Sequence, residues 1–122
     1  MAQSVQTFGE FRMDIINQCV WREHEEIRLT PKAFAVLRTL LDQPGQLVRK
    51  EEFFRRVWPA SVVSEAALTV CIRELRCALR DDARRPRYIE TLHRRGFRLM
   101  RTVVTSQWKS EESITRGSMN LP

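Results

Sequence analysis

The chain has 122 residues, of which 43% are apolar and 30% are charged, a balance that fits one ordinary globular domain and excludes disorder along the whole chain. The formal net charge is +6 and the isoelectric point is about 10.0, which favours a polyanionic partner. No apolar run approaches the roughly 20 residues that span a bilayer, and the first residues lack the basic and apolar regions of a secretory signal, so a cytoplasmic location near the nucleoid is expected.

Residues 7–30 are expected to form strands. Their apolar side chains occur in short runs, which are interrupted at Asn17-Gln18 and by the charged segment 22–26, REHEE. Short apolar runs separated by turn residues are typical of small hairpins. The pattern therefore predicts a small antiparallel meander.

Two helices are expected after the strands. Thr30 is a suitable N-cap, and Pro31 occupies the first helical position, where its missing N–H costs nothing. Apolar residues then recur at helical spacing until the turn-forming sequence 43–45, QPG. A second helix is predicted from about Lys50 to Trp58, where a proline follows and ends it.

A third helix, predicted over about 64–80, has the clearest pattern. Ser64 is a good N-cap, and Glu65 lies in the first turn. One stripe is apolar and is expected to be buried: Leu68, Ile72, Leu75 and Leu79. The adjacent stripe is polar: Thr69, Arg73, Arg76 and Arg80. This arrangement is typical of a DNA-recognition helix, although a solvated charged face has the same pattern.

The segment 88–100 is predicted to form a β-hairpin. Apolar and polar residues alternate in it, and a tight turn is expected near Arg95-Gly96. From about Thr102 the chain becomes polar and loses its periodicity. The sequence therefore predicts one domain over residues 1–103 and a polar flexible tail or linker over 104–122.

The positive charge is concentrated beside and within this hairpin. Residues 84–101 contain seven arginines and one acidic residue, Glu90, and the charges of all other residues cancel. A local excess of arginine is typical of a nucleic-acid binding surface. Double-stranded DNA is therefore the expected partner.

The cysteines and histidines do not form a metal-binding pattern. Cys19, Cys71 and Cys77 are odd in number and irregularly spaced, and no CxxC or HxxxH pattern occurs. They are expected to be buried or half-buried thiols in a reducing compartment. The sequence also lacks a nucleophile elbow and a Gly-rich phosphate loop, so we expect no metal, no cofactor and no enzymatic activity.

Four blocks of sequence occur in the order and at the spacing of a known family. They are LTPKAFAVLRTLLDQPGQLV at 29–48, VWP at 57–59, ALTVCIRELRCALRDD at 67–82 and PRYIETLHRRGFRL at 86–99. Over roughly residues 8–101 the chain resembles the OmpR/PhoB-type effector domain, and the third block looks most like one-component regulators of the ToxR, CadC and HilA kind. The resemblance implies an α+β winged helix-turn-helix with an N-terminal antiparallel four-stranded sheet, three helices and a C-terminal β-hairpin wing.

The same resemblance implies how such a domain works. The third helix is expected to enter the major groove of a promoter, and the wing to reach the adjacent minor groove. Domains of this kind commonly bind tandem repeats as head-to-tail dimers and activate transcription through RNA polymerase. The loop 59–63 is where relatives meet the polymerase.

The third helix supplies most of the predicted contacts with DNA. Thr69 and Val70 are expected to touch base edges or a thymine methyl group. Arg73 is expected to reach bases or phosphates. Arg76 and Arg80 are expected to contact mainly phosphates.

Other predicted contacts come from the resemblance. Trp58 matches a tryptophan whose indole N–H contacts a phosphate in relatives, and a core-edge aromatic is an equally good interpretation. Thr91 matches a position near the DNA backbone. His93 occupies the wing position that inserts an arginine into the minor groove in some relatives, and Arg94 and Arg95 follow it at the tip.

Some residues depart from the family pattern. Arg49 stands where Ser or Thr often precedes the second helix, which removes a side-chain cap worth about 1 kcal/mol. Arg80 replaces a frequent glycine, and Phe97 replaces a tyrosine whose hydroxyl reaches a phosphate. Glu74 either accepts from a cytosine amino group or, as we favour, pairs with a neighbouring arginine.

A second function is compatible with the same fold. A winged-helix domain can serve as a protein-interaction module or anti-activator with weak or no specific DNA binding. The arginine cluster argues for DNA, and retention or loss of genomic fragments in a gel shift separates the two.

Overall fold

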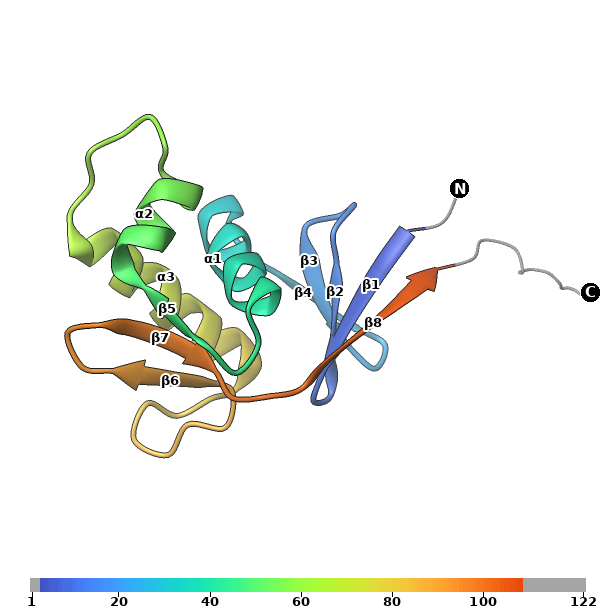
Figure 1. Cartoon of the computed structure of the whole chain (residues 1–122). Coiled ribbons are helices and arrows are strands. Elements are labelled where there is room, and N and C mark those ends of the chain that lie inside the picture. Colours follow the sequence, from blue (N-terminus) through green and yellow to red (C-terminus); the bar gives the residue numbers. More distant parts are fainter. Residues whose placement is uncertain (1–2, 109–122) are drawn as a thin grey trace, which may run out of the picture.

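The computed structural model describes residues 3–108, which form three helices and two antiparallel sheets (Figure 1). The helices are α1 (Pro31–Asp42), α2 (Lys50–Val57) and α3 (Glu65–Leu79). The strands are β1 (Gln3–Phe8), β2 (Phe11–Asp14), β3 (Cys19–Arg22), β4 (Glu25–Arg28), β5 (Leu47–Arg49), β6 (Ile89–Leu92), β7 (Gly96–Leu99) and β8 (Val103–Trp108). The predicted α+β winged helix-turn-helix is confirmed.

Strands β1 to β4 form the meander that the sequence predicts. Each strand pairs antiparallel with the next, and the sheet order is β4-β3-β2-β1-β8. Asp14 shapes the turn between β2 and β3, because its carboxylate accepts hydrogen bonds from the backbone N–H and the side-chain amide of Asn17 at 3.0 and 2.8 Å. The sheet nevertheless has five strands, not four.

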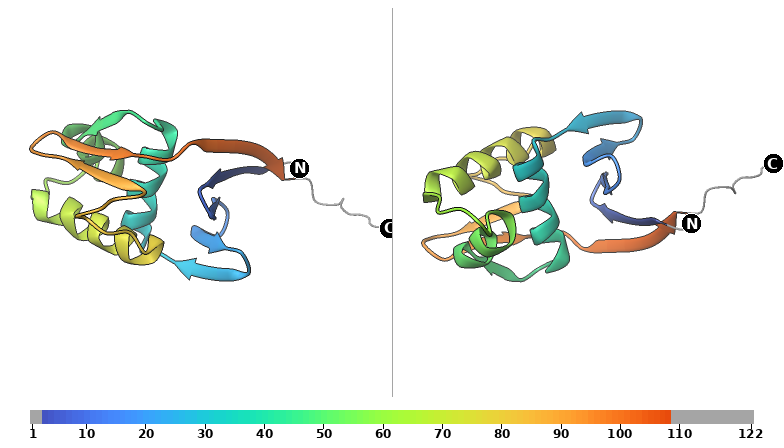
Figure 2. Two further views of the ribbon diagram at one scale, coloured as in Figure 1. Left: turned by 90° about the horizontal axis from the view of Figure 1, so that it is seen from below. Right: turned by 90° about the horizontal axis from the view of Figure 1, so that it is seen from above.

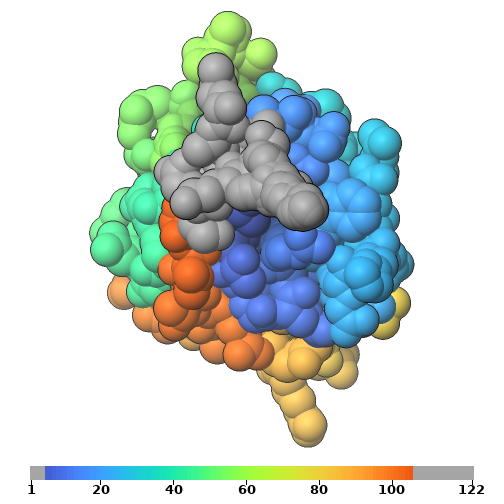
Figure 3. All heavy atoms as spheres, turned by 90° about the vertical axis from the view of Figure 1, so that its right-hand side faces the viewer, coloured from blue at the N-terminus to red at the C-terminus, as the bar shows by residue number. Residues whose placement is uncertain are grey.

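The fifth strand, β8, comes from the part of the chain that the sequence assigns to a tail. It pairs with β1 along its whole length, from Phe8 opposite Val103 to Gln3 opposite Trp108. Figure 3 looks onto this sheet and shows β8 in orange beside the blue β1. The paired structure thus reaches residue 108, past the predicted boundary at 103, and the rest of the expected tail lies outside the described residues.

Helix α1 lies between the N-terminal sheet and the remaining elements, as both views in Figure 2 show. It begins as predicted: Thr30 is the N-cap, its hydroxyl accepts from the Ala33 N–H at 3.3 Å, and Pro31 follows. Most of its side chains are buried, including Phe34, Val36, Leu37, Leu40 and Leu41. The core therefore continues from the sheet through α1 to α2 and α3.

Helices α2 and α3 begin without side-chain caps. Arg49 precedes α2 and makes no capping bond, as its sequence position predicts. Ser64 precedes α3, but its side chain does not bond the helix, contrary to the expected capping role. Glu65 instead forms an ion pair with Lys50 of α2 at 2.7 Å. None of the helices within residues 3–108 is both long and apolar enough to cross a bilayer.

Strands β6 and β7 form the wing, and β5 adds a third strand, in the order β5-β7-β6. Tyr88 connects this part of the molecule to the N-terminal sheet. Its ring centroid lies 5.2 Å from that of Phe11, and its hydroxyl accepts from the Glu10 N–H at 3.4 Å. The wing is thus fixed to both the helices and the sheet.

Candidate nucleic-acid interface

A groove of about 530 Å³ runs between α3 and the wing. Its walls bring together residues from two segments of the chain that the sequence singled out separately. From α3 they include Thr69, Arg73 and Arg76, and from the hairpin Thr91, His93 and Arg94. Figure 1 shows the hairpin lying along α3, with its tip at the left. The other predicted contact residues, Trp58, Val70, Arg80 and Arg95, do not line the groove.

Helix α3 has the two faces that its sequence predicts. Its apolar stripe is buried: Leu68, Ile72, Leu75 and Leu79. Thr69 and Arg73 are exposed, and the Val70 side chain is 58% exposed despite being apolar. The exposed stripe of α3 therefore faces the groove with one hydroxyl and one unpaired guanidinium, because no carboxylate within residues 3–108 pairs with Arg73.

Arg76 joins α3 to the wing. Its Nη2 donates to the Ile89 carbonyl oxygen at 2.9 Å and to Thr91 Oγ1 at 2.8 Å. Burial lowers the pKa of Arg76, and the negative charges of Asp81 and Asp82 oppose that effect. Arg76 therefore holds the first strand of the wing against α3, and its Nη2 and the Thr91 hydroxyl already have partners inside the protein.

Glu74 joins α3 to the start of α1, which neither interpretation of its sequence position predicted. Its two carboxylate oxygens accept from the backbone N–H and from the hydroxyl of Thr30, each at 2.8 Å. The favoured pairing with a neighbouring arginine is therefore wrong. Both oxygens are bonded at the α1 N-terminus, so Glu74 is a structural tie between α3 and α1. Its contact with a cytosine amino group stays a prediction.

Replacing Glu74 by alanine is expected to lower the free energy of unfolding by about 2 kcal/mol, because two bonds to a charged acceptor disappear. Urea unfolding followed by circular dichroism measures this. Glu10→Ala is the matched control, since Glu10 is exposed in the β1–β2 turn and its carboxylate has no partner within residues 3–108. An unchanged stability together with a relaxed preference at one base pair would instead support the base-reading role.

The tip of the wing turns two residues earlier than expected. The Arg95 N–H donates to the Leu92 carbonyl oxygen at 2.8 Å, so His93 and Arg94 are the central residues of the turn. Arg94 adopts a left-handed conformation with φ of 64°. His93 and Arg94 are both exposed, while the Arg95 carbonyl accepts from the Lys50 N–H at 3.2 Å and fixes the tip to α2.

Trp58 lies at the edge of the core. Its side chain is 9% exposed, its ring centroid is 6.1 Å from that of Phe54, and Lys32 Nζ lies 5.8 Å above the ring. Lys32 also donates to the Val57 carbonyl oxygen at 2.9 Å. These contacts support the core-edge interpretation of Trp58. Its contact with a phosphate stays a prediction.

Comparisons with known proteins decide the family. The model of the family described as "Transcriptional regulatory protein, C terminal" matches residues 24–99, more than half of the chain. The chain belongs to the OmpR/PhoB family of DNA-binding transcriptional regulators. This family of transcription-factor domains agrees with the expectation that the chain is not an enzyme.

Individual members of the OmpR/PhoB family match most of this chain. The transcriptional regulator HilA of Salmonella typhimurium is 37% identical over 101 residues, 83% of this chain and 18% of HilA. The transcriptional activator CadC of Escherichia coli is 34% identical over 124 residues, 100% of this chain and 23% of CadC. The chain therefore spans only about a fifth of the length of these curated relatives.

Solved structures of OmpR/PhoB domains have the same fold. The DNA-binding domain of Escherichia coli CadC superposes with a TM-score of 0.74 and 28% identity, covering 85% of this chain and 98% of that one. The Klebsiella pneumoniae RstA DNA-binding domain, in complex with the RstA box, gives a TM-score of 0.71 and 24% identity over 79% of this chain and 96% of that one. At that identity the RstA match concerns the fold alone.

One residue that shapes this groove was not predicted from the sequence. Asp81, just after α3, accepts hydrogen bonds from the backbone N–H groups of Arg87, Tyr88 and Ile89 at 2.7, 3.2 and 2.9 Å. It thereby fixes where the wing begins. An aspartate directly after a helix and before a loop is a common signal for such bonds to backbone N–H groups, but its distant partners cannot be read from the sequence.

The three cysteines differ in accessibility. Cys19 and Cys71 are buried, and burial raises the pKa of both thiols, that of Cys19 to about 11. Cys77 is exposed and lines the groove, contrary to the expected burial. Within residues 3–108, no three His, Cys, Asp or Glu side chains lie close enough together to hold a metal ion.

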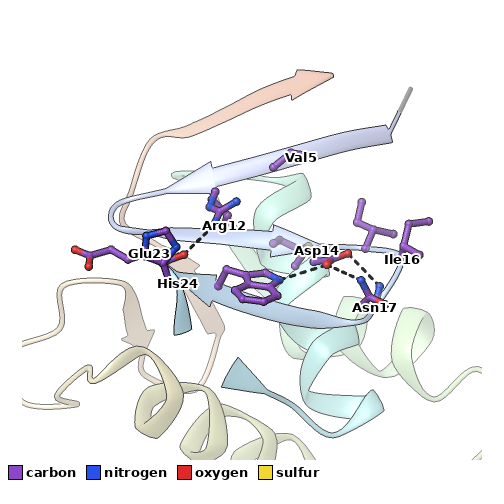
Figure 4. Close-up of a pocket in the computed structure, with 10 residues that line it drawn as sticks. Val5, Arg12, Asp14, Ile16, Asn17, Glu23 and His24 are labelled. Atoms are coloured by element: carbon purple, nitrogen blue, oxygen red, sulfur yellow. Dashed lines mark hydrogen bonds between the residues drawn. The ribbon is translucent and has the colours of Figure 1, made fainter. Parts of the chain in front are cut away.

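A second groove, of about 490 Å³, lies on the outer face of the N-terminal sheet (Figure 4). Its polar part is occupied by internal bonds: Trp21 donates to Asp14 at 3.3 Å, and Arg12 donates to the Glu23 carbonyl oxygen at 2.9 Å. Its apolar part includes Val5 and the exposed Ile16. It is separate from the groove beside α3 and shares no lining residue with it.

Proposed function

We propose that this chain is the DNA-binding part of a sequence-specific transcriptional regulator, an activator, that binds double-stranded promoter DNA. Helix α3 enters the major groove, and the wing at residues 88–100 reaches the adjacent minor groove. The observation that carries the proposal is the groove between α3 and the wing, which gathers Thr69, Arg73, His93 and Arg94 on one surface.

The dimensions and chemistry of this surface support DNA as the partner. The major groove of B-DNA admits one α-helix, and arginine recognises both guanine edges and phosphates. Arg73, Arg94 and Arg95 are exposed and have no ion-pair partner within residues 3–108. The RstA domain, which shares the fold, was solved in complex with the RstA box.

The family also supports the finer parts of the proposal. CadC is a transcriptional activator, which favours activation over repression. The loop 59–63 joins α2 to α3 and presents a fully exposed Val62, a suitable contact for RNA polymerase. Binding to tandem half-sites as a head-to-tail dimer and a cytoplasmic position at the nucleoid complete the proposal.

The proposal is tested by selecting duplexes from fragmented genomic DNA and measuring their affinity against scrambled duplexes. A specific regulator binds its selected site about 10³-fold or more tightly than random DNA, and its affinity falls steeply with salt. If no fragment is retained at moderate salt, a protein-interaction module becomes the better function. If every fragment binds equally well, the sequence-specific part of the proposal fails.

Alkylation of Cys77 reports directly on occupancy of the groove. In the unbound protein, iodoacetamide is expected to modify the exposed Cys77 and to spare Cys19 and Cys71, whose thiols are buried. Saturation with the selected duplex should slow the reaction at Cys77 in proportion to the fraction of protein bound, as measured by peptide mass spectrometry. A scrambled duplex at high salt is the control and should leave the rate unchanged. Undiminished labelling of Cys77 under saturating operator would contradict the placement of DNA in this groove.

A further inference from the structure

Residues 80–88 form a structured loop between α3 and β6. Among them, Arg80 alone was predicted from the sequence to contact DNA. Its backbone is fixed by two aspartates. Asp81 accepts from three N–H groups at its end, and Asp82 accepts from the Arg84 N–H at 2.9 Å. Figure 3 shows this yellow-orange loop projecting beyond the outline of the N-terminal sheet.

The seven arginines of the basic segment divide into two groups by their partners. Three serve the fold. Arg98 pairs with Glu90, with Nε at 2.9 Å from the carboxylate. Arg87 donates to the Arg80 carbonyl oxygen at 3.4 Å, and the Arg101 guanidinium lies 4.9 Å above the Tyr88 ring.

The other four arginines are exposed and have no carboxylate partner within the part of the chain that the structure describes: Arg84, Arg85, Arg94 and Arg95. Arg94 and Arg95 belong to the wing tip. Arg84 and Arg85 belong to the loop, at the other end of the hairpin. The exposed charge therefore forms two separate patches.

The two aspartates of the loop do not form ion pairs with these arginines. The Asp81 and Asp82 carboxylates bond backbone N–H groups, and no ion pair joins either one to Arg84 or Arg85 within residues 3–108. The acidic side chains of the loop thus stabilise its own conformation. A fixed backbone at the two arginines lowers the entropy that ordering the loop would cost on binding.

The loop adjoins the groove proposed for DNA. Ala83, which immediately precedes the two arginines, and Asp81 line the same groove as Arg73. The loop follows the C-terminal end of α3 and lies away from the wing tip (Figure 1). If α3 holds DNA, the loop therefore lies on the flank of the duplex opposite the wing tip. A duplex carries a phosphate charge about every 1.7 Å along its axis, so backbone is present wherever the duplex extends past α3.

We propose that Arg84 and Arg85 form a phosphate-binding site for the duplex flanking the operator. This inference rests on the proposed function, since it needs α3 to hold DNA. The site binds backbone oxygens and carries no base specificity, so it adds affinity and fixes the orientation of the domain on its operator.

The experiment combines two changes, the variant Arg84→Ala/Arg85→Ala and a duplex trimmed at the flank that the loop faces. On the long duplex the variant is expected to bind roughly tenfold more weakly than the natural chain at low salt, and the slope of log affinity against log salt should fall by about 0.9 for each phosphate that the variant no longer neutralises. On the trimmed duplex the two proteins should bind alike.

Two further variants separate a phosphate contact from a general effect of charge. Arg84→Lys/Arg85→Lys keeps the charges and should restore most of the affinity, because a phosphate accepts from an ammonium as well. Arg28→Ala/Arg38→Ala removes two exposed arginines elsewhere and should leave the difference between long and trimmed duplexes intact.

Wild-type affinity and salt slope for the double alanine variant on the long duplex would overturn the proposal. So would an equal reduction in affinity on both duplexes, which would indicate that the loop acts through the fold of the domain and not through the flanking phosphates. If the natural chain itself selects no duplex, the proposed function has failed instead, and the two failures are distinguishable.

Discussion

Replacing Arg73 by alanine is expected to weaken binding to the selected operator by about 1–3 kcal/mol, while binding to random DNA changes much less. Arg73 lies on the exposed stripe of α3, lines the groove and has no ion-pair partner within residues 3–108. Its guanidinium therefore reaches DNA without first breaking an internal bond. Fluorescence anisotropy with selected and scrambled duplexes, at several salt concentrations, measures the affinity for the operator and the affinity for random DNA.

Two further variants separate the loss of a specific contact from the loss of positive charge. Arg73→Lys keeps the charge but not the planar fork, so it should retain a phosphate contact and lose a bidentate contact with guanine. Arg38→Ala removes an exposed arginine of α1 and controls for net charge. If Arg73→Ala binds its operator normally and discriminates no better or worse than the natural chain, α3 is not the recognition helix.

Arg76 differs from Arg73 because its guanidinium is already bonded to the wing. In the sequence it shares one stripe with Arg73, and the spacing alone assigns both to the DNA-facing side. In the structure Arg73 is exposed, while Arg76 is half-buried and bonds Ile89 and Thr91. Helical spacing gives the face of a residue, but the partner across a groove depends on a segment that lies 13 to 15 residues further along the chain.

The same distinction explains which elements were predictable. The start of α1 follows from Thr30-Pro31, and the buried stripe of α3 follows from its 3.6-residue period, because both signals lie within a few residues. Strand β8 has no such signal: VVTSQW is short, and its partner β1 lies at the opposite end of the chain. The tie between Glu74 and Thr30 spans 44 residues and was missed for the same reason.

The sequence pattern indicates that Gly96 matters, but it assigns the glycine to the wrong physical role. The sequence assigns it to the hairpin turn, whereas the left-handed residue of that turn is Arg94. Gly96 begins β7 and stands opposite Arg49 of β5. A Cβ atom at Gly96 would lie 2.0 Å from the Val48 carbonyl oxygen and 2.9 Å from its carbonyl carbon. Glycine is therefore required by the close approach of two backbones.

Gly96→Ala is accordingly expected to lower the free energy of unfolding by about 3 kcal/mol, a large share of the 5–15 kcal/mol that a domain usually has. The clashing atoms belong to backbone, so no side chain can rotate away, and β5 must separate from β7. Gly45→Ala is the matched control: Gly45 has φ of 76°, and its added Cβ would meet nothing within 4 Å, so only conformational strain of about 1 kcal/mol is expected. Urea unfolding of both variants measures the difference. Equal decreases in the two would show that strand β5 does not approach the wing this closely, and the wing would then lack the support that holds its tip beside α3.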